Sequence, residues 1–373
     1  MDRADEGTFT DFDAARLTVR LGAVTGNFRI AQKLAAPAAV AAVVKADAYG
    51  TGLDPVGRTL AKAGCDSFFV ARLEEGMALR PLAPNARIFV LDGAQPDMVP
   101  ALITNNLTPV LNSIGEIAAW SAVARQTRTQ LDAVVHVDTG MNRLGLPANE
   151  LSLLAAEQAR RLEGLRVVLW MSHLACSDDP HNRMNRTQLE RFRTALAMLP
   201  QAPASLSASG GIMLGKEYLF DMVRPGLGLY GGNPQPSAAN PFAPVVRLTS
   251  RILQVHRAAK GETVGYGATF RTKRPSLLGV AGLGYADGIL RSLSNHGAVA
   301  VSGARAPVVG RVSMDLVTFD LTDVPGDVAP GADVELIGDT ISLEEIAAAA
   351  STISYEILTS LSRRARRSYE EAP

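Results

Sequence analysis

The chain has 373 residues, with 37 basic and 37 acidic side chains and therefore a formal net charge of zero. A balanced charge argues against a protein that binds nucleic acid or a membrane surface, because both need a basic field. The hydrophobic share of 47% and the charged share of 20% are typical of a globular protein with a sizeable core. Two cysteines, Cys65 and Cys176, are too few for a disulfide framework or a four-thiolate zinc site, and we expect no metal.

The N-terminal segment, residues 1–14, is acidic and lacks the basic-then-apolar order of a signal peptide. The longest apolar run, residues 34–44, is too short to span a bilayer and contains Pro37. We therefore expect a soluble, cytoplasmic protein.

Eight short apolar runs recur up to residue 230, separated by stretches with helical spacing. The runs are 38–45, 67–72, 87–92, 107–111, 131–138, 165–173, 205–208 and one within 220–230. Helical patterns cover 73–82, 114–126, 150–161 and 187–199, and Asp54 followed by Pro55 is typical of a helix start. This alternation favours a closed (β/α)8 barrel of the TIM type, with an open α/β sheet of fewer strands as the alternative.

After residue 230 the pattern changes. Residues 231–244 are rich in glycine and proline and indicate a linker. Short β-type runs follow at 246–256, 277–282, 298–302, 312–321 and 333–337, and helical patterns at 342–350 and 357–367. We therefore expect a barrel over 12–240 and a mostly β domain over 241–373, on which residues 1–11 pack. The basic run 363–367 fits a helix C-terminus, where arginines complement the helix dipole.

In a βα barrel, the residues that act on a ligand lie where the strands end. Lys45 follows the first run directly, where partial desolvation lowers the pKa of an amine, as a Schiff-base lysine requires. Arg143 follows the fifth run, His173 ends the sixth, and Arg224 belongs to the eighth. Ser209 opens a small-residue segment whose backbone N–H groups can hold a phosphate. Each residue alone fits a structural role, but together they predict a functional site at one barrel face.

Six motifs occur in order along the chain: VVKADAYGTG, HVDTGMNRLG, RPGLGLYGG, VGYGATF, GLGYADG and GRVSMD. Through them the sequence resembles alanine racemase, a pyridoxal-phosphate enzyme of fold type III, from about residue 17 to residue 369. Six motifs in order are highly specific, whereas any single one is weak. The resemblance implies an N-terminal barrel, a C-terminal β domain and a cytoplasmic homodimer. It also implies interconversion of L- and D-alanine, which supplies D-alanine for peptidoglycan.

The resemblance assigns the catalytic roles. Lys45 would form the imine with pyridoxal phosphate and act as the base on the D-enantiomer. Tyr266 would be the base on the L-enantiomer, reaching the site from across the dimer interface. Because the unperturbed pKa of tyrosine is about 10, nearby cations must stabilise its phenolate, and His173 and Arg224 match that relay. Arg224 would also face the pyridine nitrogen, which stays an acceptor because arginine only donates.

The remaining matches concern the cofactor phosphate and the substrate. The phosphate positions are Tyr49, Ser209, Gly226, Leu227 and Tyr355, and the substrate positions are Arg143 and the backbone N–H of Met314 for the carboxylate and Tyr285 at the entrance. Two positions depart from the family. His136 stands where many members carry a carboxylated lysine that holds the arginine, so no carbamate can form there. Thr51 replaces the histidine usual in Ala-Tyr-Gly-His-Gly.

Three other functions compete with this interpretation. A fold-type III decarboxylase of basic amino acids needs an acidic residue at the pyridine nitrogen and a reactive cysteine in the second domain, which Arg224 and the lack of cysteine after Cys176 oppose. A non-enzymatic carrier of pyridoxal phosphate is a bare barrel, which the second domain with Tyr266 opposes. A racemase of broader specificity on the same fold stays open.

Overall fold

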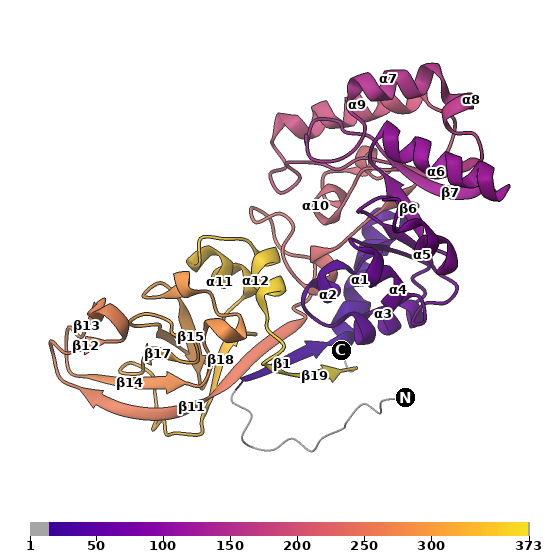
Figure 1. Cartoon of the computed structure of the whole chain (residues 1–373). Coiled ribbons are helices and arrows are strands. Elements are labelled where there is room, and N and C mark those ends of the chain that lie inside the picture. Colours follow the sequence, from indigo (N-terminus) through magenta and orange to yellow (C-terminus); the bar gives the residue numbers. More distant parts are fainter. Residues whose placement is uncertain (1–14, 372–373) are drawn as a thin grey trace. The chain divides into compact units, whose positions relative to one another are not determined.

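The computed structural model describes residues 15–371, which divide into two compact units (Figure 1). The barrel unit is Leu21–Ala243. The β unit comprises residues 15–20 together with residues 244–371. No helix among the described residues is long and apolar enough to cross a membrane.

Seven parallel strands form the curled sheet of the barrel unit, in the order β3-β4-β5-β6-β7-β8-β9. They are β3 (Ala42–Val43), β4 (Ser67–Val70), β5 (Arg87–Val90), β6 (Thr108–Leu111), β7 (Leu131–His136), β8 (Leu165–Met171) and β9 (Ala204–Ser205). A short parallel pair, β2 (Ala39–Val40) and β10 (Met222–Val223), lies between the ends of this sheet. Backbone bonds from Arg224 N to Ser207 O (2.8 Å) and from Val43 N to Pro225 O (3.0 Å) complete the ring. The predicted barrel architecture is confirmed.

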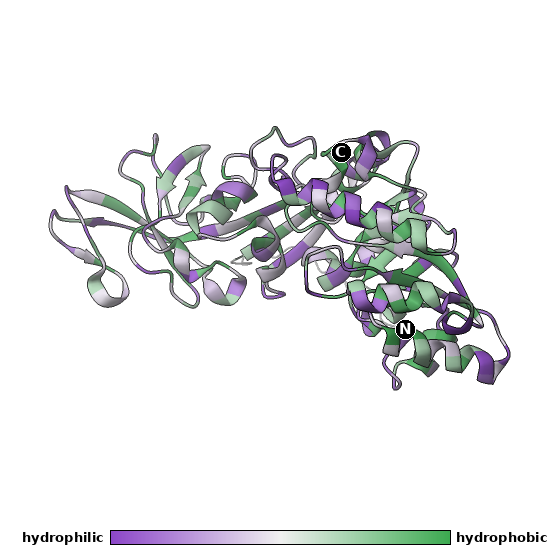
Figure 2. Ribbon diagram, turned by 90° about the horizontal axis from the view of Figure 1, so that it is seen from above, coloured by the Kyte–Doolittle hydropathy of each residue, from purple (hydrophilic) through white to green (hydrophobic). Residues whose placement is uncertain are grey.

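Helices follow the strands around the outside of the barrel unit (Figure 1). They are α1 (Leu21–Ala35), α2 (Lys45–Tyr49), α3 (Leu53–Lys62), α4 (Leu73–Leu79), α5 (Val99–Thr104), α6 (Ile114–Thr127), α7 (Ala148–Ala156), α8 (Gln158–Arg161), α9 (Arg183–Met198) and α10 (Ser209–Ile212), with short 3-10 turns η1 (Lys216–Tyr218) and η2 (Leu227–Tyr230). All four residues of β4 are buried, as expected for a parallel strand covered on both faces. Figure 2 shows green apolar strands inside this unit and purple stretches on its helices.

The predicted start of α3 needs a correction. The helix begins at Leu53, and Gly52 rather than Asp54 precedes it. The Leu53 N–H donates to Oδ1 of Asp47 at 2.8 Å, so a side chain from the preceding turn satisfies this orphan donor. Asp54 lies inside the helix and pairs with Arg58 one turn later.

The β unit is built on an eight-stranded sheet in the order β16-β15-β18-β11-β1-β19, to which β14 and β17 are joined through β11. Its strands are β1 (Ala15–Arg20), β11 (Val246–Ala258), β14 (Ser276–Ala281), β15 (Ala298–Val301), β16 (Ala304–Pro307), β17 (Val317–Asp320), β18 (Asp333–Ile337) and β19 (Arg366–Glu370). A hairpin of β12 (Thr263–Val264) and β13 (Phe270–Arg271), the turns η3 (Tyr266–Ala268), η4 (Tyr285–Asp287) and η5 (Arg291–Leu293), and helices α11 (Leu343–Ala349) and α12 (Ser354–Ser360) complete it. The expected mostly β second domain is therefore present.

The two ends of the described chain pair with each other in this sheet. β1 is antiparallel to β11 and parallel to β19. Its residues 15–20, expected within the barrel span 12–240, thus belong to the β unit, and residues 1–11 lie outside the described part. The helix expected over 357–367 ends at Ser360, and Arg366 and Arg367 belong to β19. The basic run therefore does not end a helix, because pairing with β1 draws it into the sheet.

Candidate active site

Lys45 lies just beyond β3, at the start of a turn with unusual backbone geometry. The four residues that follow have left-handed φ angles, from 52° at Ala48 to 55° at Ala46. Such a conformation costs roughly 1 kcal/mol or more per non-glycine residue, so other contacts must hold it. The Ala46 N–H donates to the carboxylate of Glu75 at 2.6 Å, and the buried hydroxyl of Thr51 donates to the Ala48 carbonyl. Thr51, a departure from the family motif, thus helps to close this turn.

Two effects make the amine of Lys45 less basic. Burial lowers its pKa, and the positive charge of Arg143 lowers it further, whereas Glu75 and Asp92 act in the opposite direction. A lower pKa increases the fraction of neutral amine, which is the nucleophilic form. The barrel thus brings Lys45 and Arg143 close enough to influence each other.

Arg224 is buried just beyond β10, with 3% of its surface exposed. Its Nη1 donates to Oγ of Ser205, and its Nη2 donates to the Ser172 carbonyl at 2.7 Å and to Nδ1 of His173 at 3.3 Å. Its Nε donates to no group within residues 15–371. Burial lowers the pKa of Arg224 to about 10, so the side chain remains a cation at neutral pH.

His173 is half-buried beside Arg224. Burial holds its pKa well below the usual value, and the charges of Arg224 and Arg143 lower it further. Arginine can only donate, so Nδ1 of His173 must accept the bond. The neutral ring therefore carries its proton on Nε2.

Ser209, Gly226 and Tyr49 come together on the same unit. The Oγ of Ser209 accepts hydrogen bonds from the N–H groups of Gly226 (3.0 Å) and Gly228 (3.1 Å). A Cβ at Gly226 would lie 2.1 Å from the hydroxyl of Tyr49, so only glycine leaves room for that hydroxyl. Tyr49 is held by stacking on Tyr230, with ring centroids 4.6 Å apart. Leu227, between the two glycines, is buried.

His136 occupies the position at which many family members carry the carboxylated lysine. The ring is buried, and its Nδ1 lies 2.9 Å from Oδ1 of Asn112. The Asn112 amide donates to the carbonyls of Leu91 and Val110, which fixes its oxygen toward His136. Nδ1 is therefore the donor of the histidine, and Nε2 is left as an acceptor. Burial first, and then the charge of Arg224, lower the pKa of His136 to about 4, so the ring is neutral.

Arg143 is exposed on a loop that starts and ends beside His136. The Leu146 N–H donates to the His136 carbonyl at 2.8 Å. Between these points, the Asp138 carboxylate accepts the N–H groups of Gly140 (2.8 Å) and Met141 (2.9 Å), which tightens the loop. The loop therefore presents Arg143 from the end of β7.

The site residues predicted in the β unit lie on separate segments. Tyr266 is 73% exposed in η3, and Tyr355 is 40% exposed at the start of α12. Tyr285 and Met314, which are also exposed, are brought together by bonds between their loops, such as Tyr285 N to Ser313 O at 3.0 Å.

Sequence reasoning missed Asn112, Glu75, Ser205 and Tyr230. Asn112 and Ser205 lie at strand ends, so a wider search of those positions could have found them. Glu75 and Tyr230 lie in a helix and a 3-10 turn, where the sequence carries no signal of a contact with residues 46–49.

The comparisons with known proteins agree with one another. The model of the alanine racemase N-terminal domain matches residues 19–234, and that of the alanine racemase C-terminal domain matches residues 245–369. A protein of Agrobacterium fabrum named "Alanine racemase, catabolic" is 47% identical over 95% of this chain and 92% of its own length. A second protein of that organism, named "Alanine racemase, biosynthetic", is 46% identical over 95% of this chain and 93% of its own length.

Among solved structures, an alanine racemase from Bartonella henselae with covalently bound pyridoxal phosphate is 38% identical to this chain. Its TM-score is 0.92, over 95% of this chain and 99% of that one. The biosynthetic alanine racemase from Pseudomonas aeruginosa is 33% identical to this chain. Its TM-score is 0.90, over 96% of this chain and 99% of that one. With both family models matched and relatives this similar over nearly their whole length, the chain belongs to the alanine racemase family.

Proposed function

We propose that the chain racemises alanine, interconverting the L- and D-enantiomers with pyridoxal phosphate as cofactor. The observation that carries the proposal is Arg224, a buried cation that donates to His173 and whose Nε has no partner among the described residues. A donor that stays protonated suits an acceptor ring nitrogen, whereas the competing decarboxylase chemistry needs a carboxylate there.

The residues of the barrel unit fit the cofactor at three points. Lys45 offers an amine of lowered pKa for covalent attachment. Ser209, Tyr49 and Gly226 lie against one another, because Ser209 Oγ accepts the Gly226 N–H and the Tyr49 hydroxyl fills the space that a Cβ at residue 226 would need. The two hydroxyls are the groups that we propose for the cofactor phosphate. Leu227 completes the proposed phosphate site within this unit. Tyr355 of the β unit is assigned to the phosphate by the family resemblance alone. Arg224 Nε offers the donor for the ring nitrogen.

When bound, pyridoxal phosphate supplies an electron sink that makes the α-proton of an amino acid labile. Arg224 would keep the pyridine nitrogen of a bound cofactor an acceptor, because its guanidinium donates and never accepts. Arg224 thereby favours return of the proton to the α-carbon over side reactions such as transamination.

Two bases then act at the α-carbon, one on each face. Lys45 moves the proton of the D-enantiomer through its Nζ, and Tyr266 moves that of the L-enantiomer through its hydroxyl oxygen. The cations near His173 stabilise the phenolate that Tyr266 needs. We place Tyr266 in the site of the partner subunit of a homodimer, and its 73% exposure in the single chain is consistent with that role.

The substrate is held by its carboxylate. Arg143 and the backbone N–H of Met314 bind it, and Tyr285 narrows the entrance toward small side chains. The proposed setting is the cytoplasm, with D-alanine supplied to peptidoglycan. The relatives support the reaction rather than its direction, because one is named catabolic and another biosynthetic.

A single assay tests the proposal. The purified protein with added pyridoxal phosphate is incubated with L-alanine, L-serine, L-lysine and L-arginine, and both enantiomers and released CO2 are measured. We expect racemisation of alanine alone or by far the fastest. Comparable rates on all four would indicate the broader racemase, CO2 release would indicate a decarboxylase, and cofactor binding without turnover would indicate a carrier.

A further inference from the structure

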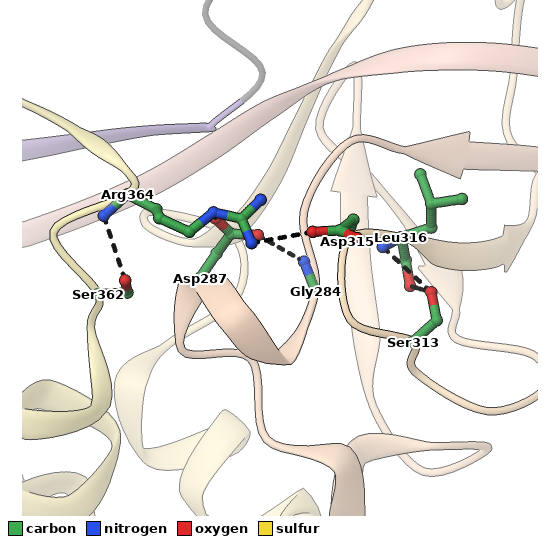
Figure 3. A network of polar contacts seen from close by, with 7 residues as sticks. All are labelled: Gly284, Asp287, Ser313, Asp315, Leu316, Ser362 and Arg364. Carbon is green, nitrogen blue, oxygen red and sulfur yellow. Dashed lines mark hydrogen bonds and ion pairs between the residues drawn. The ribbon is translucent and has the colours of Figure 1, made fainter.

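Three proposed site residues of the β unit come from segments far apart in the chain. Tyr285 lies in η4, Met314 in the loop before β17, and Tyr355 in α12. Arg364, in the connection between α12 and β19, reaches toward the first two of these segments (Figure 3). Its Nε lies 3.3 Å from Oδ1 of Asp287, and its Nη1 lies 2.9 Å from Oδ1 of Asp315.

Asp287 links this arginine to the turn that carries Tyr285. Its side chain is buried, and its Oδ2 accepts the N–H of Gly284 at 2.9 Å, which closes η4. The carbonyl of Asp287 accepts the N–H of Ser362, and the Ser362 hydroxyl accepts the N–H of Arg364. The segment around Arg364 is therefore bound to η4 through both backbone and side chains.

The turn that carries Tyr285 also packs directly on the loop that carries Met314. The Ala286 N–H donates to the Met314 carbonyl at 3.1 Å. A Cβ at Gly284 would lie 2.2 Å from the carbonyl oxygen of Ser313, so the two backbones touch there. Asp315, in that same loop, is the second carboxylate on Arg364 (Figure 3).

Helix α12, which carries Tyr355, contacts the residue that follows η4. Gly288 has a φ of 103°, and a Cβ there would lie 2.3 Å from the carbonyl oxygen of Ser360. Ser360 is the last residue of α12, which begins with Ser354 and Tyr355. The end of α12 therefore packs on the turn that Asp287 closes.

We propose that Arg364 is a positioning residue, which holds Tyr285, Met314 and the helix of Tyr355 as one preassembled half of the active site. The effect of Arg364 on substrate binding rests on the proposed function. The contact with Asp315 is half-exposed and contributes little alone. Asp287 is buried, however, so removing the arginine leaves a buried carboxylate without its cation. The loss therefore acts mainly on η4 and Tyr285.

The test compares Arg364→Met and Arg364→Lys with wild type in the holoenzyme. Arg274→Met is the matched control, because it removes an exposed ion pair with Asp323 elsewhere in the β unit. Amide hydrogen exchange is followed in peptides covering 284–288 and 313–316, together with KM and kcat for L-alanine and the preference for L-alanine over L-serine.

For Arg364→Met we expect about tenfold faster exchange in both peptides and a KM raised about tenfold, with kcat less affected and the preference for alanine reduced. Arg364→Lys should recover part of each effect, and Arg274→Met should match wild type. If amide exchange in the two peptides of Arg364→Met were as slow as in wild type, the proposal would be overturned. If that variant does not fold, Arg364→Gln, which removes the cation beside Asp287 but keeps a side-chain amide, decides through exchange at 284–288, where the wild-type rate would overturn the proposal. An inactive wild type would contradict the racemase function, yet the exchange measurement would still decide the role of Arg364.

Discussion

Arg224 donates a hydrogen bond from Nη2 to Nδ1 of His173, over 3.3 Å. Because this contact and burial both disfavour a second proton on the ring, His173 is neutral with its hydrogen on Nε2. We expect nitrogen NMR of labelled protein to show Nδ1 unprotonated, with no titration near the ordinary histidine pKa of about 6.5. An imidazole that carries its proton on Nδ1, or that titrates near that value, would rule out the arrangement.

His136 makes the stability of the protein depend on pH. An unfolded histidine has a pKa of about 6.5, whereas that of folded His136 is about 4. Between these values the unfolded chain binds a proton that the folded chain does not, so the free energy of unfolding falls as pH falls. For this one group the loss is about 3 kcal/mol over the whole window.

The measurement is urea unfolding of wild type and His136→Asn, at about pH 7 and about pH 5. We expect the wild type to lose more stability between the two conditions than the variant does. An equal loss in both proteins would mean that His136 is not buried as a neutral ring.

A substitution at Gly226 tests the proposed phosphate site. In Gly226→Ala the new Cβ would lie 2.1 Å from the Tyr49 hydroxyl and must displace it. We expect the affinity for pyridoxal phosphate to fall by about tenfold or more, in an absorbance titration of the apoprotein. Gly26→Ala is the control, because a Cβ there meets nothing within 4 Å. If Gly226→Ala bound the cofactor as tightly as the control does, the proposed phosphate site would be wrongly assigned.

The proposal that Tyr266 acts in the partner's site predicts the activity of dimers that contain two different variants. Lys45→Ala and Tyr266→Phe should each be nearly inactive as homodimers. If Tyr266 serves the partner's site, a dimer of one subunit of each kind has one intact site and one doubly altered site. Random mixing of equal amounts should then recover about a quarter of wild-type activity. Recovery would fail if Lys45 and Tyr266 of the same chain worked together, since every site would keep one defect.

The barrel could be predicted because its strands are buried on both faces and are therefore continuously apolar, as β4 and β5 show. The order of these strands also predicts that Lys45, Arg143, His173 and Arg224 follow strand ends, as they do in the structure, whereas their proposed roles rest on the family resemblance. In contrast, β1 and β19 pair across nearly the whole length of the chain. No local pattern indicates such a pairing, so the sequence predicts a helix for the arginines at 366 and 367 that belong to β19 in the structure.

Finer features of the site depend on contacts that the sequence does not encode locally. The left-handed turn over residues 46–49 contains no glycine, although glycine is the usual signal of that conformation. The tautomer of His136 is set by Asn112, which is 24 residues away and belongs to a different strand end. We propose that Tyr266 acts in the site of a second subunit, and no local pattern in the sequence encodes a contact between subunits.

The central claim is that Lys45 and Tyr266 act as separate bases on opposite faces of the substrate. The most direct test follows exchange of the α-proton of L-alanine and of D-alanine with deuterated solvent, in Tyr266→Phe and wild type. We predict that the variant loses exchange from L-alanine far more than exchange from D-alanine, since Lys45 still serves the second enantiomer. Equal loss from both enantiomers would contradict the two-base account.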